Sequence, residues 1–310
     1  MTKTPASHTE ARFHDEEAAR AHLEATRWPN GPECPHCGGV ERISRIEANP
    51  AKKVRAGLLF CGDCRQQFSV TVGTVFEDSK LPVHKWVYAI HLICASKKGI
   101  SSKQLERVLK VSYKTAWFMS HRIRAAMATT PSGQMGGGGK IVEVDETYYG
   151  NLPGKKIRQG SKKHKNKIMA LVERGGHVRA IHVAEVDGRN VKDILKAQVA
   201  QGTHVMTDEA RVYATIPYKH STVNHSIYEF ARGKVTTNTV EGFFSILKRG
   251  LSGVYQNVSE QHLHRYLKEF EFRYNNRESL GVNDEQRATE LLKSIQGKRL
   301  TYRRINQASA

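Results

Sequence analysis

Two cysteine pairs near the N-terminus constrain this chain more than any other feature of its sequence. Cys34 and Cys37 lie in CPHCGG, and Cys61 and Cys64 lie in FCGDC, so each pair has two residues between its thiols. That spacing is typical of a tetrahedral zinc site, and four thiolates leave no position open for water or substrate. A redox C-x-x-C motif is the alternative, but it needs a pair at the start of a helix. We therefore predict a structural Zn²⁺ in a zinc ribbon, with ERISRIEAN and GLLFC pairing as a hairpin between the two cysteine pairs.

The charge balance predicts a polyanionic partner. The 310 residues include 49 Lys and Arg against 30 Asp and Glu, which gives a net charge of +19, and for such a chain nucleic acid is the first candidate. The longest apolar run, residues 86–95, is too short to cross a bilayer. The N-terminus lacks the basic start and apolar stretch of an export signal. We therefore expect a cytoplasmic protein with no membrane partner.

Residues 81–128 have the pattern of a helical module that resembles a helix-turn-helix. Three helical stretches are separated by short breaks, and serines are positioned to cap the second and third stretches. The third stretch carries Tyr113, Lys114, Arg122 and Arg124, which could contact phosphates or base edges. The alternative is an ordinary three-helix packing module whose basic residues are solvated.

Three carboxylates and a lysine follow a glycine-rich stretch, TTPSGQMGGGGK, that we interpret as a linker. Asp145 ends a half-buried strand in IVEVDETYYG, Asp208 ends a second strand in THVMTDEARVY, and Glu241 begins a helix. Lys248, seven positions after Glu241, lies on the same helical face. Hard oxygens on separate elements, directed at one point, suit divalent cations that act on a phosphodiester. Each residue alone also has an ordinary explanation: a strand end, a helix cap or a surface charge.

Several blocks together resemble the zinc-ribbon group of DDE transposases from bacterial insertion sequences. These blocks are CPHCGG, CGDCRQQFSVTVGTVFEDSKLPVHKW, VEVDETYYG, MTDEARVY and NTVEGFFSILKRGLSGVYQNVSEQHLHRYLKEFEFRYNNR, in that order. The resemblance implies a ribonuclease H-like catalytic domain with an acidic triad on Asp145, Asp208 and Glu241 and with Mg²⁺ or Mn²⁺ as cofactor. It also implies that Lys248 is the basic residue seven positions after the glutamate. Asn238, on the same helical face, is the alternative third residue, and we favour Glu241 because a carboxylate binds a divalent ion better than an amide does.

The expected fold is therefore α/β, a ribonuclease H-like mixed sheet with flanking helices, preceded by a small zinc ribbon and a helical module. The predicted domains are the zinc ribbon (20–80), the helix-turn-helix-like module (81–128), the linker (129–140), the catalytic domain (141–290) and a basic tail (291–310).

A basic segment between the first two strands of the predicted site carries the remaining DNA-binding candidates, unless it is only a solvated loop. They are Lys155, Lys156, Arg158, Lys162 and Lys163. The resemblance implies a DNA transposase that binds element ends and target DNA as double strands, assembles as a homo-oligomer, and cuts and joins DNA. One alternative is a metal-dependent structure-specific nuclease. The other is a zinc-ribbon DNA-binding regulator without catalysis.

Overall fold

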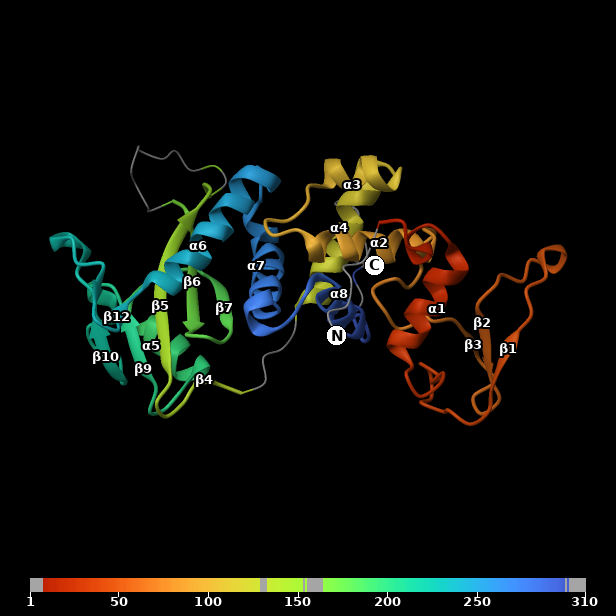
Figure 1. The fold of residues 1–310 in the computed structure, drawn as a ribbon, viewed down its shortest axis with the longest axis horizontal. Coiled ribbons are helices and arrows are strands. Elements are labelled where there is room, and N and C mark those ends of the chain that lie inside the picture. The colour runs from red at the N-terminus through yellow and green to blue at the C-terminus, as the bar shows by residue number, and fades with distance from the viewer. Residues whose placement is uncertain (1–7, 129–132, 153, 155–163, 299, 301–310) are drawn as a thin grey trace. The chain divides into compact units, whose positions relative to one another are not determined.

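The computed structural model describes residues 8–128, 133–152, 154, 164–298 and 300, and the chain divides into two compact units (Figure 1). The first unit comprises Met1–Met127 with Asn283–Ala310, and the second comprises Ala128–Val282. Among the described residues, none of the helices combines the length and the apolar character needed to span a bilayer.

The first unit is a helical body with a small sheet. Its helices are η1 (Ala11–Phe13), α1 (Glu16–Arg27), η2 (Pro50–Lys52), α2 (Val83–Ala95), α3 (Ser102–Leu109), α4 (Tyr113–Met127) and α8 (Asp284–Lys293). Ser101 caps α3, since its side chain accepts from the Gln104 backbone N–H. Ser112 precedes α4, and its hydroxyl accepts from the Thr115 N–H at 3.2 Å. The caps expected for the second and third helices are therefore confirmed.

The predicted hairpin between the cysteine pairs is also confirmed. Strand β1 (Ile43–Ile46) pairs antiparallel with β2 (Leu58–Cys61), and β2 pairs antiparallel with β3 (Gln67–Phe68). In this register Ile43 lies opposite Cys61, so the second cysteine pair begins at the end of the hairpin that is farther from its turn.

Helix α8 belongs to the first unit, although the sequence placed residues up to 290 with the catalytic domain. It packs on α1 and α2 through buried Leu291 and Leu292. The Arg12 guanidinium donates to Glu285 at 2.7 Å, and the Arg287 guanidinium donates to the Cys94 carbonyl at 2.7 Å. The amphipathic pattern of this helix marks one buried face but does not say which core that face joins.

The second unit is built on a five-stranded mixed sheet in the order β10-β9-β5-β6-β7. Strands β5 (Ile141–Tyr149), β6 (Asn166–Glu173) and β7 (Val178–Val183) form an antiparallel meander. Strand β9 (His204–Thr207) runs parallel to β5, and β10 (Lys219–Thr222) runs parallel to β9. This arrangement confirms the mixed sheet that we predicted.

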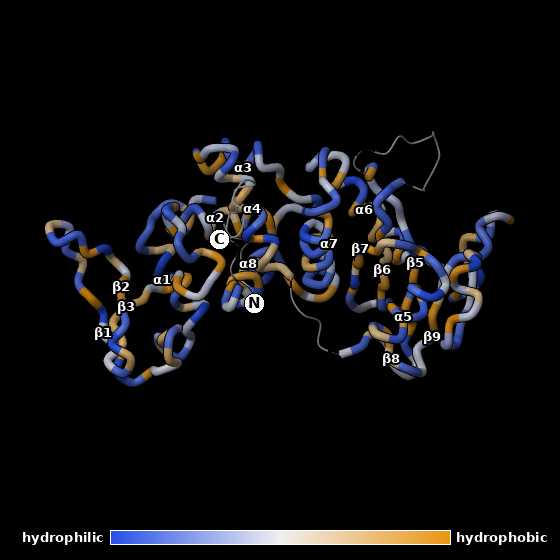
Figure 2. Tube along the Cα trace, turned by 180° about the vertical axis from the view of Figure 1, so that it is seen from behind, coloured by the Kyte–Doolittle hydropathy of each residue, from blue (hydrophilic) through white to orange (hydrophobic). Residues whose placement is uncertain are grey.

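Helices cover both faces of this sheet. Helix α5 (Gly188–Gln198) shares a core with Val142, Val144 and other side chains of one face. Helices α6 (Asn238–Gly250) and α7 (Glu260–Asn275) share a core with the opposite face of β6 and β7. The hydrophobic strand segments in Figure 2 lie between these layers. Because side chains alternate along a strand, Glu143 and Asp145 of β5 share one face, as the sequence predicted, and the structure shows that this face is the α6 side.

Short elements complete the second unit: β4 (Met135–Gly136), β8 (Val199–Ala200), η3 (Arg211–Tyr213), η4 (His225–Ile227), β11 (Ala231–Arg232), β12 (Val235–Thr236), η5 (Leu251–Tyr255) and η6 (Glu278–Leu280). Part of the predicted linker is one of them, since β4 pairs with β8 and Met135 is buried. Gly136 has a φ of 82°, and a Cβ there would lie 2.3 Å from the Thr203 hydroxyl oxygen. This glycine therefore serves close packing rather than flexibility. The other end of that linker, residues 129–132, and most of the predicted basic tail lie outside the described residues.

Candidate active site and metal centre

The four paired cysteines converge on one point in the first unit. Their sulfur atoms all lie within 4.8 Å of one another, and the Cys34 and Cys64 sulfurs are 3.6 Å apart, as are those of Cys37 and Cys61. Tight turns follow the first cysteine of each pair: the Gly38 N–H donates to the Cys34 carbonyl and the Arg65 N–H to the Cys61 carbonyl, both at 2.9 Å. The cluster therefore fits a tetrahedral structural zinc.

The electrostatics of this cluster also fit a cation. The backbone N–H groups of Cys64 and Asp63 point at the Cys61 sulfur and lower the pKa of that thiol to about 7. Burial, and then hydrogen bonds with the other thiols, raise the pKa of Cys64 to about 12. A Zn²⁺ at the centre would supply the positive charge that four crowded thiolates need.

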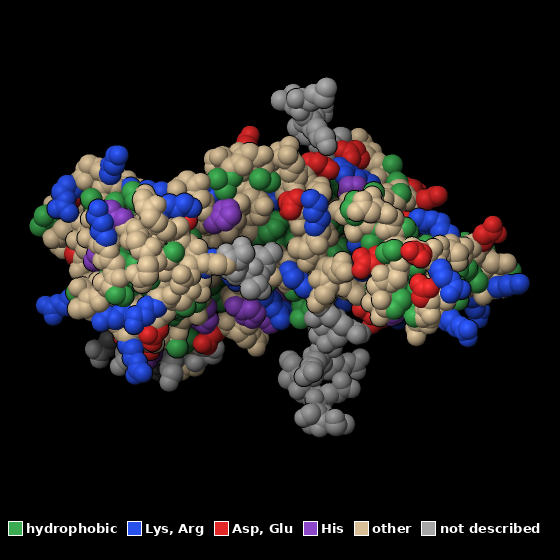
Figure 3. Space-filling model, turned by 90° about the horizontal axis from the view of Figure 1, so that it is seen from below, with side chains coloured by type: hydrophobic (Ala, Val, Ile, Leu, Met, Phe, Trp, Pro, Cys, Tyr) green, Lys and Arg blue, Asp and Glu red, His purple; other side chains and the backbone are tan. Residues whose placement is uncertain are grey.

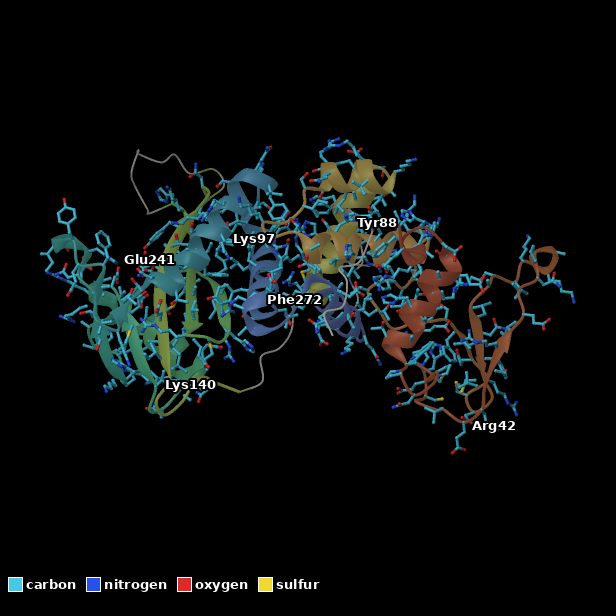
Figure 4. All side chains as sticks on the ribbon, in the orientation of Figure 1. Arg42, Tyr88, Lys97, Lys140, Glu241 and Phe272 are labelled. Atoms are coloured by element: carbon cyan, nitrogen blue, oxygen red, sulfur yellow. The ribbon has the colours of Figure 1, made fainter. Side chains whose placement is uncertain are left out.

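The three predicted carboxylates lie on three neighbouring elements of the second unit. Asp145 lies in the middle of β5, not at a strand end as predicted, and Asp208 directly follows β9, which runs parallel to β5. Glu241 lies in the first turn of α6, which packs against β5, and Figure 4 shows it beside that strand. Lys248 lies two turns further along α6 and is exposed.

The charges of these carboxylates act on one another. Burial, followed by the negative charges of Glu146, Asp208 and Glu241, raises the pKa of Asp145 to about 7. The Asp145 carboxylate also accepts from the Glu146 N–H at 2.7 Å, which favours the charged form. Asp208 accepts from the Ala210 N–H, and Glu241 accepts from the Thr237 hydroxyl at 2.7 Å. The site thus concentrates negative charge in a partly buried place, which a divalent cation would neutralise.

The acidic cluster is looser than the cysteine cluster. Within the described part of the chain, the cysteines are the one set of three or more His, Cys, Asp or Glu whose ligand atoms approach one another closely enough to hold a metal ion. The acidic site is therefore a set of converging carboxylates rather than a closed cage. Asn238, the alternative third residue, is exposed at the first position of α6.

Sequence reasoning missed a buried glutamate that joins β5 to α6. Glu143 is fully buried, and its Oε2 accepts from the N–H groups of Thr239 and Val240 at 2.8 and 3.0 Å. Its Oε1 accepts from the Thr239 hydroxyl at 2.9 Å and from Arg174 Nε at 2.6 Å. Glu143 thus satisfies the free amides at the start of the helix that carries Glu241. The signal was present in the sequence, because Glu143 shares a strand face with Asp145.

Arg174 extends this connection to the segment that precedes α6. Its guanidinium donates to the carbonyls of Lys234 and Thr236 at 2.6 and 2.9 Å. The strand and the helix that carry two of the three acidic residues are therefore held together by one ion pair and its hydrogen bonds.

Two further acidic residues beside the triad were also missed. Glu146 accepts from the buried Tyr213 hydroxyl at 2.6 Å, and burial followed by the charge of Glu146 raises the pKa of Tyr213 well above its ordinary value. Glu209, next to Asp208, accepts from the Ser226 hydroxyl at 2.6 Å, and this bond is the first of those that lower the pKa of Glu209 to about 2. Glu146 thus holds η3 beside the site and also adds its charge to that of Asp145, whereas Glu209 holds η4 beside Asp208.

The predicted DNA-binding residues have different outcomes. Lys155, Lys156, Arg158, Lys162 and Lys163 lie outside the described residues. Figure 3 shows Lys and Arg side chains spread over the face in view rather than gathered into one patch.

On α4, Lys114 is exposed, but the prediction for Arg122 needs correction. Arg122 is 6% exposed, donates to the Glu77 carbonyl at 2.7 Å, and lies over the rings of Trp86 and Phe118. These contacts turn its guanidinium into the core of the first unit, away from any phosphate. The sequence pattern placed Arg122 on the helix but could not show which face was buried.

Comparisons with known proteins follow the same division of the chain. Residues 135–275 match the model of the ISXO2-like transposase domain, and residues 14–67 match the model of the transposase zinc-ribbon domain. An uncharacterized protein in transposable element ISH50 of Halobacterium salinarum is 28% identical over 280 residues, which cover 84% of this chain and 91% of that protein. An uncharacterized transposase-like protein of Haemophilus influenzae is 30% identical over 104 residues, which cover 33% of this chain and 83% of that protein.

One solved structure that aligns with this chain is the cryo-electron microscopy structure of the simian T-cell lymphotropic virus intasome in complex with PP2A regulatory subunit B56 gamma. The alignment covers 54% of this chain and 63% of the chain in that structure. The TM-score is 0.28 and the sequence identity is 15%.

Proposed function

Because the chain belongs to the ISXO2-like transposase family and carries that family's zinc-ribbon domain, we propose that it catalyses DNA transposition by cleaving and joining DNA at insertion-sequence ends. The observation that carries this proposal is the convergence of Asp145, Asp208 and Glu241. The negative charges of Asp208 and Glu241 help to raise the pKa of Asp145 to about 7.

The carboxylates of these three residues would hold Mg²⁺ or Mn²⁺. Their hard oxygen atoms suit such ions, and their crowding leaves negative charge to be neutralised. When bound, divalent cations activate the attacking oxygen and stabilise the leaving oxygen of a phosphodiester displacement. Lys248, two turns along α6, would bind a phosphate next to the reacting one.

Two displacements account for transposition at this site. Hydrolysis at an element end exposes a 3′-hydroxyl, and that hydroxyl then attacks a phosphodiester of the target DNA. Each step exchanges one phosphate–oxygen bond for another, so the reaction needs neither a covalent protein intermediate nor an external energy source.

The first unit would recognise the element ends. Cys34, Cys37, Cys61 and Cys64 would hold a Zn²⁺ that stabilises the ribbon, and Lys114 would contact DNA from α4. The basic segment with Lys155, Lys156, Arg158, Lys162 and Lys163 would follow the DNA backbone near the acidic residues. Pairing of two ends calls for at least two copies of the chain, and access to chromosomal DNA places the protein in the cytoplasm.

The test uses purified protein, labelled DNA from the flanks of its own gene and a plasmid target, with and without Mg²⁺. Asp145→Asn is the test variant, and Asp193→Asn, at an exposed position of α5, is the matched control. We expect Mg²⁺-dependent cutting and joining by the wild type and by Asp193→Asn, and DNA binding alone by Asp145→Asn. Cutting without joining would indicate a nuclease. Binding without either reaction would indicate a DNA-binding regulator, and equal turnover by Asp145→Asn would refute the site.

A further inference from the structure

A short loop beside the acidic residues exposes three large apolar side chains within four positions. Ile227 is 69% exposed, Tyr228 is 85% exposed and Phe230 is 56% exposed. Elsewhere in the described part of the chain, such exposed side chains occur singly, at Val40, Val108 and Tyr113. A cluster of this kind on a charged protein marks a binding surface more often than a scattered side chain does.

The loop is anchored next to two of the three triad carboxylates. Glu209, which follows Asp208, accepts from the His225 N–H at 3.0 Å and from the Ser226 N–H at 3.1 Å. From the other side, the His225 Nε2 atom lies 3.6 Å from Glu241 Oε1. The exposed side chains are therefore presented at the edge of the proposed active site.

The backbone holds Tyr228 in an outward position. Its φ is 59°, in the left-handed region that aromatic residues rarely adopt. The Tyr228 N–H donates to the His225 carbonyl at 3.1 Å, and the Phe230 ring packs at 5.4 Å from the His225 ring. Phe230 thus supports the loop, and Tyr228 is the ring left free to contact a ligand.

The charges carried by the loop and its flanking strands favour a nucleic acid over a protein. Residues 219–236 contain Lys219, Arg232 and Lys234 against the single acidic residue Glu229, which lies 3.7 Å from Arg232, and all three cations are exposed. Arg232 also ties the ribbon of β11 and β12 to β10 by donating to the Thr222 carbonyl at 3.1 Å. An exposed aromatic ring among cations combines the two features that bind single-stranded DNA: a stacking surface and contacts to phosphates.

We propose that Tyr228 stacks on an unpaired base beside the phosphate at the acidic site. Bases inside a duplex are already stacked on their neighbours, so the ligand is a base freed at a DNA end or junction. This proposal rests on the proposed function, because it takes the adjacent carboxylates as the place where DNA is cut.

The experiment measures binding of the full-length protein to two probes in Ca²⁺. One probe is a duplex with a three-nucleotide 3′ overhang that contains 2-aminopurine, and the other is the same duplex with blunt ends. The variants are Tyr228→Ala and Tyr228→Phe, which keeps the ring. Val40→Ala is the control at an exposed position of the first unit.

We expect the wild type, Tyr228→Phe and Val40→Ala to quench 2-aminopurine fluorescence alike. Tyr228→Ala should lose the quenching and bind the overhang about 5- to 150-fold more weakly, the range for one base–aromatic stack. Its affinity for the blunt duplex should not change.

Three results for Tyr228→Ala would overturn the proposal. The variant could quench as well as the wild type does, or it could bind both probes more weakly by the same factor. It could also differ from the wild type in oligomeric state without DNA, which would assign the loop to a protein contact. The same preparations are assayed for Mg²⁺-dependent cleavage of gene-flank DNA. Absence of cleavage by the wild type would refute the proposed function, whereas the quenching readout tests the loop by itself.

Discussion

The ion pair between buried Glu143 and partly exposed Arg174 allows a sharp test of how this fold positions its acidic residues. The substitution Glu143→Gln keeps the size of the side chain but removes its charge. The carboxylate accepts four hydrogen bonds, from Thr239 N–H, Thr239 hydroxyl, Val240 N–H and Arg174 Nε. A glutamine amide oxygen accepts two, and its NH₂ group can only donate. When the amide oxygen stays with the two backbone N–H groups, the Thr239 hydroxyl can turn to accept from the new NH₂ group, whereas Arg174 Nε can only donate and loses its partner.

The expected loss follows from these contacts. A hydrogen bond to a charged group contributes about 1.5–3 kcal/mol, so loss of the bond between Arg174 and Glu143 lowers the free energy of unfolding of the second unit by about that amount. Arg174 is 23% exposed, so water replaces part of its lost interaction and keeps the loss near the lower figure. A loss of this size is a large share of the stability of an ordinary domain.

The positions of the tryptophans allow the stability of each unit to be measured separately. Trp28, Trp86 and Trp117 all lie in the first unit, so tryptophan fluorescence in urea reports that unit alone. Hydrogen exchange of peptides from β5 and α6 reports the second unit. We expect an unchanged fluorescence transition, faster exchange at the start of α6, and slower Mg²⁺-dependent cleavage with DNA binding retained.

Asp193→Asn is the control, because that exposed carboxylate on α5 is far less constrained and its substitution should shift stability by at most about 0.5 kcal/mol. If hydrogen exchange at the start of α6 is as slow in Glu143→Gln as in the wild type, the reasoning is refuted. A shift in the tryptophan-detected transition as large as the loss of stability in the second unit would also refute it, because such a shift would show a general loss of structure.

Three other outcomes can be checked separately. Cys61→Ser should reduce the zinc content measured by elemental analysis from one ion per chain to near zero, whereas Cys94→Ser should retain it because Cys94 is buried in α2 outside the cluster; zinc retained by Cys61→Ser would contradict the ribbon. Lys114→Ala should weaken DNA binding, and it should lower by about one the slope of the logarithm of the binding constant against the logarithm of salt concentration, without changing stability. Arg122→Gln should lower the tryptophan-detected free energy of unfolding by about 2 kcal/mol, since it removes a buried hydrogen bond and ring contacts. The reverse pattern would restore Arg122 as a DNA contact. Tyr213→Phe removes the hydroxyl that donates to Glu146 and should cost the second unit about 2 kcal/mol, measured by hydrogen exchange in β5; unchanged exchange would show that water replaces this bond.

The sequence by itself determined the features that depend on local spacing. Two residues between paired cysteines define one metal site, and the confirmed hairpin between the pairs follows from the strand patterns around Ile43 and Cys61. Alternation along β5 put Asp145 and Glu143 on one face, because side-chain direction in a strand has a period of two. The mixed sheet was predicted from a resemblance carried by motifs, and the roles of Asp145, Asp208 and Glu241 remain a prediction.

Only the tertiary structure decided which surfaces meet. Helix α8 packs with the first unit rather than the second, and Arg122 faces inward rather than toward solvent. Glu143 reaches amides nearly a hundred positions later in the chain. The amphipathic or alternating pattern of an element shows that one face is buried, but long-range packing selects the partner of that face, and no local spacing encodes this choice.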